Sequence, residues 1–393
     1  MSMIQDLTII QTTVIPGDPS FCSVGRDVLD RHIEDALQAV RANSMDDFLL
    51  SLMRLLALPE NGHTRLIPND VISVVPMRFV TIGTEVRLID AAPPFLEGIG
   101  GELVSINRVP VGDIESAAES YLAGTPQRKR VIGPILFAWP GALRRLGASS
   151  DGDEIEYRLR SETGHIRDLR SNTATLVAGS TFYPHGEHGR AEVSGFAGSF
   201  LKVGDFGPTG LLLVLPSFFD PGETALAEAM SSAADLVRSR PGSVVLVDLR
   251  GNTGGNFLRT MPLIDALSEG PEDRWVVVLV DKFTFSAAIV FVAMLKHRLG
   301  KRLFLVGEEM GDGLTFFAEG GTIDLPCSGA AVRYSSAFHD WAGGRFDETT
   351  PPEIAARLVP VGTLALDRAW VAKSDNAETR DRFCREVLSS LRR

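Results

Sequence analysis

The chain has 393 residues, enough for two or three domains at roughly 150 residues each. Hydrophobic residues make up 44% and charged residues 23%, which is typical of a folded globular protein and excludes a disordered chain. The formal net charge is -11, from 39 basic and 50 acidic residues. This balance argues against a general nucleic-acid binder and against a protein that docks on anionic lipid.

The cysteines and the first residues exclude further classes. Cys22, Cys327 and Cys384 are too few and too scattered for a disulfide framework or a zinc ribbon. No stretch approaches the roughly 18 continuous apolar residues of a membrane span. The N-terminal segment has no positive region followed by a long apolar run, so we expect no signal peptide and a cytoplasmic location.

The first 70 residues predict two helices. Apolar residues recur at helical spacing from Val28 to Leu58, with a break at Asn43-Ser44, where Ser44 is a candidate N-cap. Pro59 ends the second helix, because proline cannot continue the backbone hydrogen-bond ladder.

The following stretch, to about residue 180, predicts a small β-rich module. Short strand-forming runs alternate with Pro and Gly turns, and a helical pattern lies between the last two runs. The expected strands are Val71–Val75, Met77–Ile82, Val86–Ile89, Leu103–Ile106 and Glu154–Leu159, and the expected helix is Ile114–Leu122. The loop-rich stretch from Gly179 to Gly195 is the best domain boundary in the chain.

From Gly195 onward, continuous apolar strands alternate with helices, which indicates an α/β unit with a largely parallel sheet. The expected strands are Leu211–Leu215, Val244–Leu249, Trp275–Val280 and Leu303–Val306, and the expected helices are Thr224–Arg238, Leu258–Leu267 and Ser286–His297. Ligands of such sheets bind at the carboxyl ends of the strands. We therefore expect functional residues just after Leu249, Val280 and Val306.

Two of these strand ends carry residues suited to chemistry. The turn from Arg250 to Asn256 holds three glycines, whose amides can face a phosphate or an oxyanion, although it matches neither common nucleotide-binding motif. Ser286 stands where an apolar helix begins, so it is either an N-cap or a nucleophile facing the free amides of that helix. No GxSxG motif is present.

A nucleophilic serine needs a base. His63 stands out among the seven histidines because it lies in a short polar turn, although a plain surface histidine is the alternative. His185 and His188 have the spacing of a metal-binding pair, but no third ligand is evident, so we interpret them as ordinary loop residues.

Six segments in order resemble the S41 peptidases, the group that includes C-terminal processing proteases and the tricorn-type core. VVLVDLRGNTGGN is similar to the oxyanion segment of that family, FTFSAAIVFVAMLK to its nucleophile segment and LFLVGEEMGDG to the strand and turn that follow. TIDLPCSGAAVRYSS resembles the downstream LP-x-SG strand pair, LLALPENGHTRL resembles the base segment of histidine-type members, and VRLIDAAPPFLEGIGGELVSINRVPVGDI resembles the second half of a PDZ domain.

The resemblance implies an α/β fold with a crotonase/ClpP-like ββα core, a small PDZ-like β-rich domain and an N-terminal helical cap. The expected parts are residues 1–70 for the cap, 71–185 for the PDZ-like module with its connecting segment, and 186–393 for the catalytic core. The PDZ-like module would capture a peptide or position the other domains.

The resemblance also implies site residues. Ser286 is then the nucleophile and His63 its base, as in the tricorn-like branch. The backbone amides of Gly254 or Gly255, together with that of Ala287, would form the oxyanion hole.

The chain departs from the family pattern in places. The turn at residues 307–313, where many tail-specific members carry a lysine base, has no lysine, and Ile289 stands where a glutamate is common. Tricorn-like members orient the base with a glutamate roughly 60 residues after the nucleophile, which points to Glu348. Glu308, closer to the expected pocket in sequence, is the competing candidate.

The expected function is a serine-type peptidase that acts through an acyl-enzyme. An inactive binding protein on the same fold, and a hydrolase of non-peptide esters or amides, stay open as alternatives. No metal or organic cofactor is expected, because serine, a base and backbone amides suffice. The expected partner is a peptide or protein substrate, and assembly into a homo-oligomer stays open.

Overall fold

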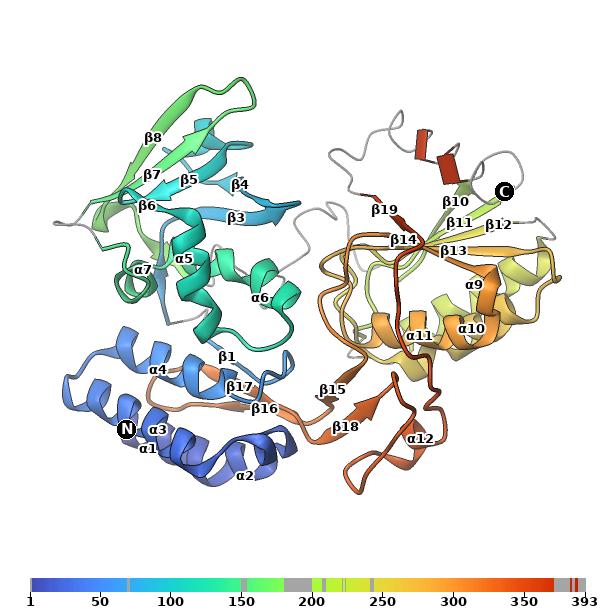
Figure 1. The fold of residues 1–393 in the computed structure, drawn as a ribbon, viewed down its shortest axis with the longest axis horizontal. Helices are drawn as coiled ribbons and strands as arrows, with labels where there is room; N and C mark the ends of the chain where they lie inside the picture. The colour runs from blue at the N-terminus through green and yellow to red at the C-terminus, as the bar shows by residue number, and fades with distance from the viewer. Residues whose placement is uncertain are drawn as a thin grey trace. The chain divides into compact units, whose positions relative to one another are not determined.

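The protein is a mixed α/β fold with several sheets, as the computed structural model shows (Figure 1). The structure describes residues 2–68, 71–149, 154–179, 200–206, 210–220, 222, 224–240, 244–370, 382–383 and 386–387. By its contacts the chain divides into a first unit, residues 1–188 and 316–338, and a second unit, residues 189–315 and 339–393. Each unit is described by itself. His185 and His188 lie outside the described residues.

The helices of the first unit follow the predicted spacing. The break at Asn43, which has a φ of 50°, separates α3 from α4, and the Ser44 hydroxyl accepts a hydrogen bond from the Asp47 amide at 3.3 Å. The predicted N-cap and the predicted pair of helices are therefore confirmed. The helices are α1 (Met3–Ile9), α2 (Ile15–Gly17), α3 (Arg26–Arg41), α4 (Met45–Ala57), α5 (Val111–Ala118), α6 (Pro126–Ile132) and α7 (Pro140–Arg145).

The strands of the first unit form three sheets. The largest has the order β3-β4-β5-β7-β8, with β6 paired to β5, and the others are β2-β9 and β1-β17-β16. The strands are β1 (Arg65–Ile67), β2 (Ser73–Val74), β3 (Met77–Ile82), β4 (Glu85–Ala91), β5 (Glu102–Ile106), β6 (Val109–Pro110), β7 (Ile155–Arg160), β8 (Ile166–Ser171), β9 (Val177–Ala178), β16 (Gly321–Asp324) and β17 (Ala331–Tyr334).

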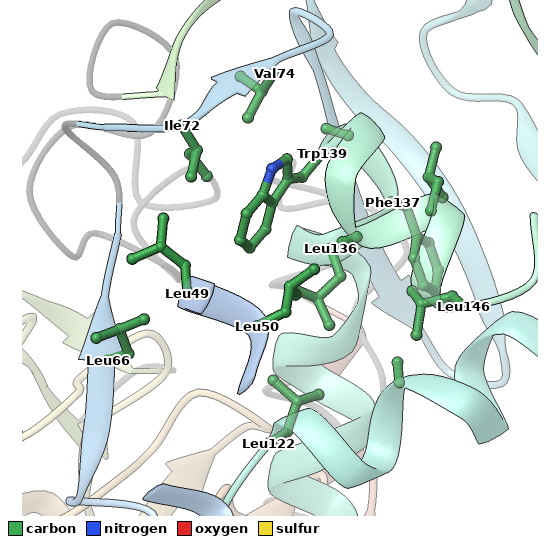
Figure 2. Packing of buried hydrophobic residues seen from close by; sticks show 14 of the residues in the cluster. Leu49, Leu50, Leu66, Ile72, Val74, Leu122, Leu136, Phe137, Trp139 and Leu146 are labelled. Carbon is green, nitrogen blue, oxygen red and sulfur yellow. The ribbon is translucent and has the colours of Figure 1, made fainter. Parts of the chain in front are cut away.

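One hydrophobic core joins the N-terminal helices to the β-rich part of this unit. Figure 2 shows Leu49 and Leu50 of α4 in the same cluster as Leu136 and Trp139. The indole nitrogen of Trp139 also donates a hydrogen bond to Asp46 at 3.1 Å, at the start of α4. Helices and sheet thus stabilise each other, and the predicted boundary at residue 70 stays a prediction.

Residues 316–338 return to the first unit and are held there by two buried aspartates. The two carboxylate oxygens of Asp6 accept the amides of Cys327 and Ser328 at 2.9 and 2.7 Å. Asp18 accepts the amide of Ser335 at 2.9 Å. Strand β17 pairs with β1 in the register Arg65↔Arg333.

The second unit contains the predicted parallel sheet. Its order is β10-β11-β12-β13-β14-β19, in which β11 to β14 and β19 run parallel and β10 is antiparallel. The strands are β10 (Lys202–Phe206), β11 (Gly210–Val214), β12 (Val244–Asp248), β13 (Trp275–Val280), β14 (Leu303–Gly307) and β19 (Arg368–Ala369). Strands β15 (Thr315–Ala318) and β18 (Ala337–Asp340) form a two-stranded sheet where the chain passes from one unit to the other, since residues 316–318 and 337–338 are counted in the first unit.

Helices cover one face of the parallel sheet, as Figure 1 shows for α9 (Ala225–Ser239), α10 (Met261–Ser268) and α11 (Ala287–Leu299). The short helix α12 (Pro352–Ala355) lies outside this layer. Phe383 and Val387 pack in a cluster with side chains from several strands. Helix α11 is apolar around its whole circumference and buried from Ala287 to Leu295. No helix within the described ranges is both long and apolar enough to cross a membrane.

We predict that Asp18→Asn destabilises the first unit by about 2–4 kcal/mol. Asp18 is buried and accepts hydrogen bonds from the Ser20 amide (3.0 Å), the Ser20 hydroxyl (2.6 Å), the Thr64 hydroxyl (2.5 Å) and the Ser335 amide (2.9 Å). All four partners donate, so an amide side chain would direct its own N–H groups at donors. Denaturant unfolding measures the change.

The matched control is Asp27→Asn on α3, where the side chain is 84% exposed, and we expect a change below about 1 kcal/mol there. Equal unfolding midpoints for Asp18→Asn and the wild type would contradict a stabilising role of this network.

Candidate active site

Ser286 is the residue directly before α11. A five-residue turn separates it from the end of β13. The backbone of Ser286 has a φ of 56° and a ψ of -126°, a conformation that costs a non-glycine residue about 1–3 kcal/mol. Although Ser286 occupies the N-cap position, its hydroxyl makes no capping hydrogen bond among the described residues. The predicted N-cap position is therefore confirmed, but the hydroxyl of Ser286 does not cap the helix. The side chain is half-buried, while both neighbouring residues are buried.

The glycine turn after β12 packs directly against Ser286. Gly254 has a φ of 100°, and a Cβ atom placed on it would lie 2.7 Å from the Ser286 Cβ and 3.0 Å from the amide nitrogen of Ala287. Only glycine fits at this distance without a shift of the serine turn. The carboxyl ends of β12 and β13 thus bring the two candidate segments into contact, as the parallel sheet requires.

The carboxylate of Asp281 links the two turns. One of its oxygens accepts the amides of Gly251, Phe283 and Thr284, each at 3.0 Å. Gly251 belongs to the glycine turn, and the other two residues belong to the serine turn. Because Asp281 is buried, these charge-assisted hydrogen bonds act in a medium of low dielectric and hold both turns in one geometry.

Asn252 decides which glycine amide is available to a ligand. Its side-chain oxygen accepts the amide of Gly254 at 2.9 Å, while its side-chain nitrogen donates to the carbonyl of Leu215 at 2.8 Å. The amide of Gly254 is therefore already used. Among the described residues, the amides of Gly255 and Ala287 have no acceptor, and Gly255 is exposed.

The backbone of Phe218 holds Gly255 in place. The amide of Phe218 donates to Gly254 at 2.9 Å, and the carbonyl of Phe218 accepts the amide of Asn256 at 2.7 Å. A Cβ atom on Gly255 would lie 1.9 Å from the carbonyl carbon of Phe218, so no other residue fits there. The backbone at this position is rigidly supported while its own N–H stays available.

His63 lies in the first unit, in the turn between α4 and β1. Its side chain is 4% exposed and stacks on Phe316, with 5.1 Å between ring centroids. The interpretation of His63 as a surface residue is therefore wrong. Asn61 supports the turn, because its side-chain nitrogen donates to the hydroxyls of Thr64 (3.0 Å) and Ser335 (2.9 Å). His63 and Ser286 belong to different units, so their pairing stays a prediction.

The two predicted acids have different surroundings, and both belong to the second unit. Glu308 follows β14, and its carboxylate lies 4.0 Å from the ammonium nitrogen of Lys282, with both side chains largely buried. Lys282 precedes Ser286 by four residues and also lies 5.2 Å from the ring centroid of Phe283. Glu348 is exposed.

The sequence interpretation missed Lys282 and Asp340. The signal that could have located Lys282 is a lysine two residues after the end of a buried strand, directly before Phe283. Asp340 ends β18, is 1% exposed, and accepts the hydroxyl of Thr315 (3.0 Å), the amide of Gly343 (2.7 Å) and Nε of Arg345 (2.6 Å). Burial raises the pKa of Asp340, but these hydrogen bonds outweigh burial and hold the pKa below its usual range.

Comparison with known proteins supports the fold. No protein-family model matches the chain, and no curated protein matches its sequence. Mature CPAF, an S41-type peptidase, is similar in structure, with a TM-score of 0.59 and 13% identity over 100% of this chain and 98% of that chain. Mature CPAF complexed with lactacystin has a TM-score of 0.60 and 13% identity over 100% and 99% of the two chains. A serine-to-alanine mutant of CPAF has a TM-score of 0.58 and 13% identity over 98% and 96%.

We predict that Ser286→Gly is more stable than Ser286→Ala by about 1 kcal/mol. Glycine adopts a positive φ without steric cost, whereas alanine keeps the backbone strain of the serine. Denaturant unfolding of both variants measures the difference.

Ser232 in the middle of α9 provides the control, because it is exposed and helical. There the order must reverse, with the glycine variant less stable than the alanine variant by about 1 kcal/mol. The same order at both positions would show that Ser286 is not strained.

Proposed function

We propose that this chain, which has the fold of the S41-type peptidases, is a serine peptidase with Ser286 as its nucleophile. The observation that carries the proposal is the positive φ of Ser286 beside Gly254. A strained serine at a strand-to-helix turn, together with two amides that have no acceptor among the described residues, is the arrangement that an acyl-transfer site needs. The strain has no evident structural purpose, because the hydroxyl does not cap α11.

In the proposed reaction, His63 removes the proton of the Ser286 hydroxyl as its oxygen attacks a peptide carbonyl. The amides of Gly255 and Ala287 stabilise the oxyanion, since the amide of Gly254 already donates to Asn252. His63 then gives its proton to the leaving amine, and water releases the acyl group from the serine.

Besides the two predicted acids, Glu308 and Glu348, the structure adds Asp340 as a third candidate for orienting His63, and we favour it. Glu308 has Lys282 as a cationic partner, and Glu348 is exposed. Asp340 is buried and kept ionised by three donors, and a carboxylate has room for about four. Its remaining lone pair is available to an imidazole N–H.

The finer description of the fold belongs to the same proposal. The parallel sheet with α9, α10 and α11 supports a crotonase/ClpP-like core, and the sheet β3-β4-β5-β7-β8 supports a PDZ-like module. In this interpretation the PDZ-like sheet captures an extended peptide at a strand edge or positions the other domains.

We expect a fluorophosphonate probe to label the wild-type chain and not Ser286→Ala, because the probe reacts with an activated serine. His63→Ala should slow labelling by about 10³-fold or more, since the serine loses its base. Ser239→Ala and His165→Ala, both at exposed positions, are the matched controls and should label like the wild type. Labelling is read on a gel and by mass spectrometry of the modified peptide.

Each other outcome of this experiment selects a different function. Absence of labelling in a folded wild-type chain would favour the inactive binding protein. Ser286-dependent labelling combined with turnover of small esters but of no peptide would favour the non-peptide hydrolase. Lactacystin is a useful second probe, because mature CPAF forms a complex with it.

The choice of acid has its own test. We predict that Asp340→Asn lowers kcat/KM by about 10³–10⁴-fold, because the imidazole loses both its orientation and its counter-charge. Glu348→Gln and Glu308→Gln serve as the comparison pair and should each lower it by less than about tenfold. Circular dichroism confirms folding. A larger loss in either glutamate variant would transfer the role to that residue.

A further inference from the structure

A large aromatic side chain lies exposed beside the glycine turn of the candidate site. Phe219 is 62% exposed, although the residue before it, Phe218, is fully buried. The ring of Phe218 packs on Phe291 of α11, with 5.6 Å between ring centroids. Successive side chains of an extended segment point to opposite sides, so Phe219 faces solvent because Phe218 faces the core. Exposure alone indicates no function, because single apolar residues are common on protein surfaces.

The backbone that carries Phe219 is fixed from the side that precedes it. Phe218 forms a parallel β-bridge with Gly255, and its two hydrogen bonds hold the segment against the glycine turn. The amide of Phe219 itself donates to the hydroxyl of Ser217 at 3.1 Å, and Ser217 is buried. The peptide unit before the Phe219 side chain is therefore held by contacts on both Ser217 and Phe218.

The residue after Phe219 is anchored as well. The two carboxylate oxygens of Asp220 accept the amides of Gly222 and Leu226 at 3.0 and 2.9 Å. Leu226 belongs to the first turn of α9, where a negative charge is favourable. Phe219 thus extends from a fixed backbone and keeps only two rotatable side-chain bonds, so little conformational entropy is lost when its ring contacts a ligand.

Phe219 lies beside the amide that the proposed reaction uses for the oxyanion. A Cβ atom on Gly255 would lie 2.2 Å from the amide nitrogen of Phe219, so the two backbones are in contact. Gly255 is exposed, and its amide has no acceptor among the described residues. A carbonyl bound at this amide would therefore have its neighbouring atoms near the segment that carries Phe219. All of these residues belong to the second unit.

We propose that Phe219 is a specificity-determining residue, whose ring contacts an apolar side chain of the peptide next to the scissile bond. This inference rests on the proposed peptidase function. Contact with the ring removes apolar surface from water on both partners, and an aromatic partner gains ring packing in addition. The apolar side chain comes either from the residue before the scissile bond or from the residue after it, because both flank the carbonyl.

Peptide kinetics test this contact and the side of the scissile bond from which it comes. One pair of peptides carries Phe or Ala before the bond, and a second pair carries Phe or Ala after it. In one pair, we expect the wild type to cleave the Phe peptide with a kcat/KM about tenfold higher than the Ala peptide. That ratio should fall to about two in Phe219→Ala and stay near tenfold in Phe219→Leu, because leucine keeps most of the apolar surface. The pair that shows the preference identifies the side.

The matched control is Val203→Ala on the edge strand β10 of the same unit, where the side chain is also exposed. This variant should keep the wild-type ratio. Phe219→Ala should cleave the Ala peptides at the wild-type rate, since their side chain makes little contact with the ring. Its denaturant unfolding midpoint should equal that of the wild type, because the ring is mostly in solvent.

An unchanged ratio in Phe219→Ala, or an equal loss for the Phe and Ala peptides, would overturn the specificity role. Failure of the peptidase proposal is a separate result, because it appears as absent labelling of Ser286 or absent turnover of every peptide. In that case, calorimetric binding of the same peptides to the Ser286→Ala chain replaces turnover. A preference for Phe over Ala in Kd that a second substitution, Phe219→Ala, removes would support the contact, and equal Kd values would overturn it.

Discussion

The carboxylate of Asp281 is the interaction on which the arrangement of the second unit depends. It bonds Gly251 on one side and Phe283 and Thr284 on the other, so one buried charge joins two turns that are about thirty residues apart in sequence. Without that link, the ends of β12 and β13 would still be neighbours in the sheet. The contact of Gly254 with the Ser286 turn, however, depends on the position of both turns to within a fraction of an ångström.

The strain at Ser286 persists because its surroundings fix the backbone on both sides. Before it, the turn is bound to Asp281, and the amide of Phe285 donates to the carbonyl of Asn252 at 3.0 Å. After it, α11 is buried on all sides and cannot rotate without moving the core. A local cost of about 1–3 kcal/mol is small against these constraints.

In the first unit, a buried carboxylate likewise holds the polar turn that carries His63. Asp18 lies in the N-terminal segment, Thr64 beside His63, and Ser335 after β17, and a single carboxylate binds all three regions together. Buried polar groups of this kind are costly unless every partner is satisfied, and here four donors meet the two oxygens.

The amino-acid sequence by itself determined the elements and their class. Helical periodicity located α3, α4 and α9, and continuous apolar runs located the parallel strands, because burial on one or both faces leaves a local pattern. Tertiary structure alone decided that the amide of Gly254 donates to Asn252 while the amide of Gly255 has no acceptor among the described residues. It also decided that His63 is buried and that Arg65 is paired with Arg333 in the sheet register. These facts depend on contacts between residues as far as 274 positions apart, which no local pattern records, because side-chain hydrogen bonds and strand registers form only when the chain is folded.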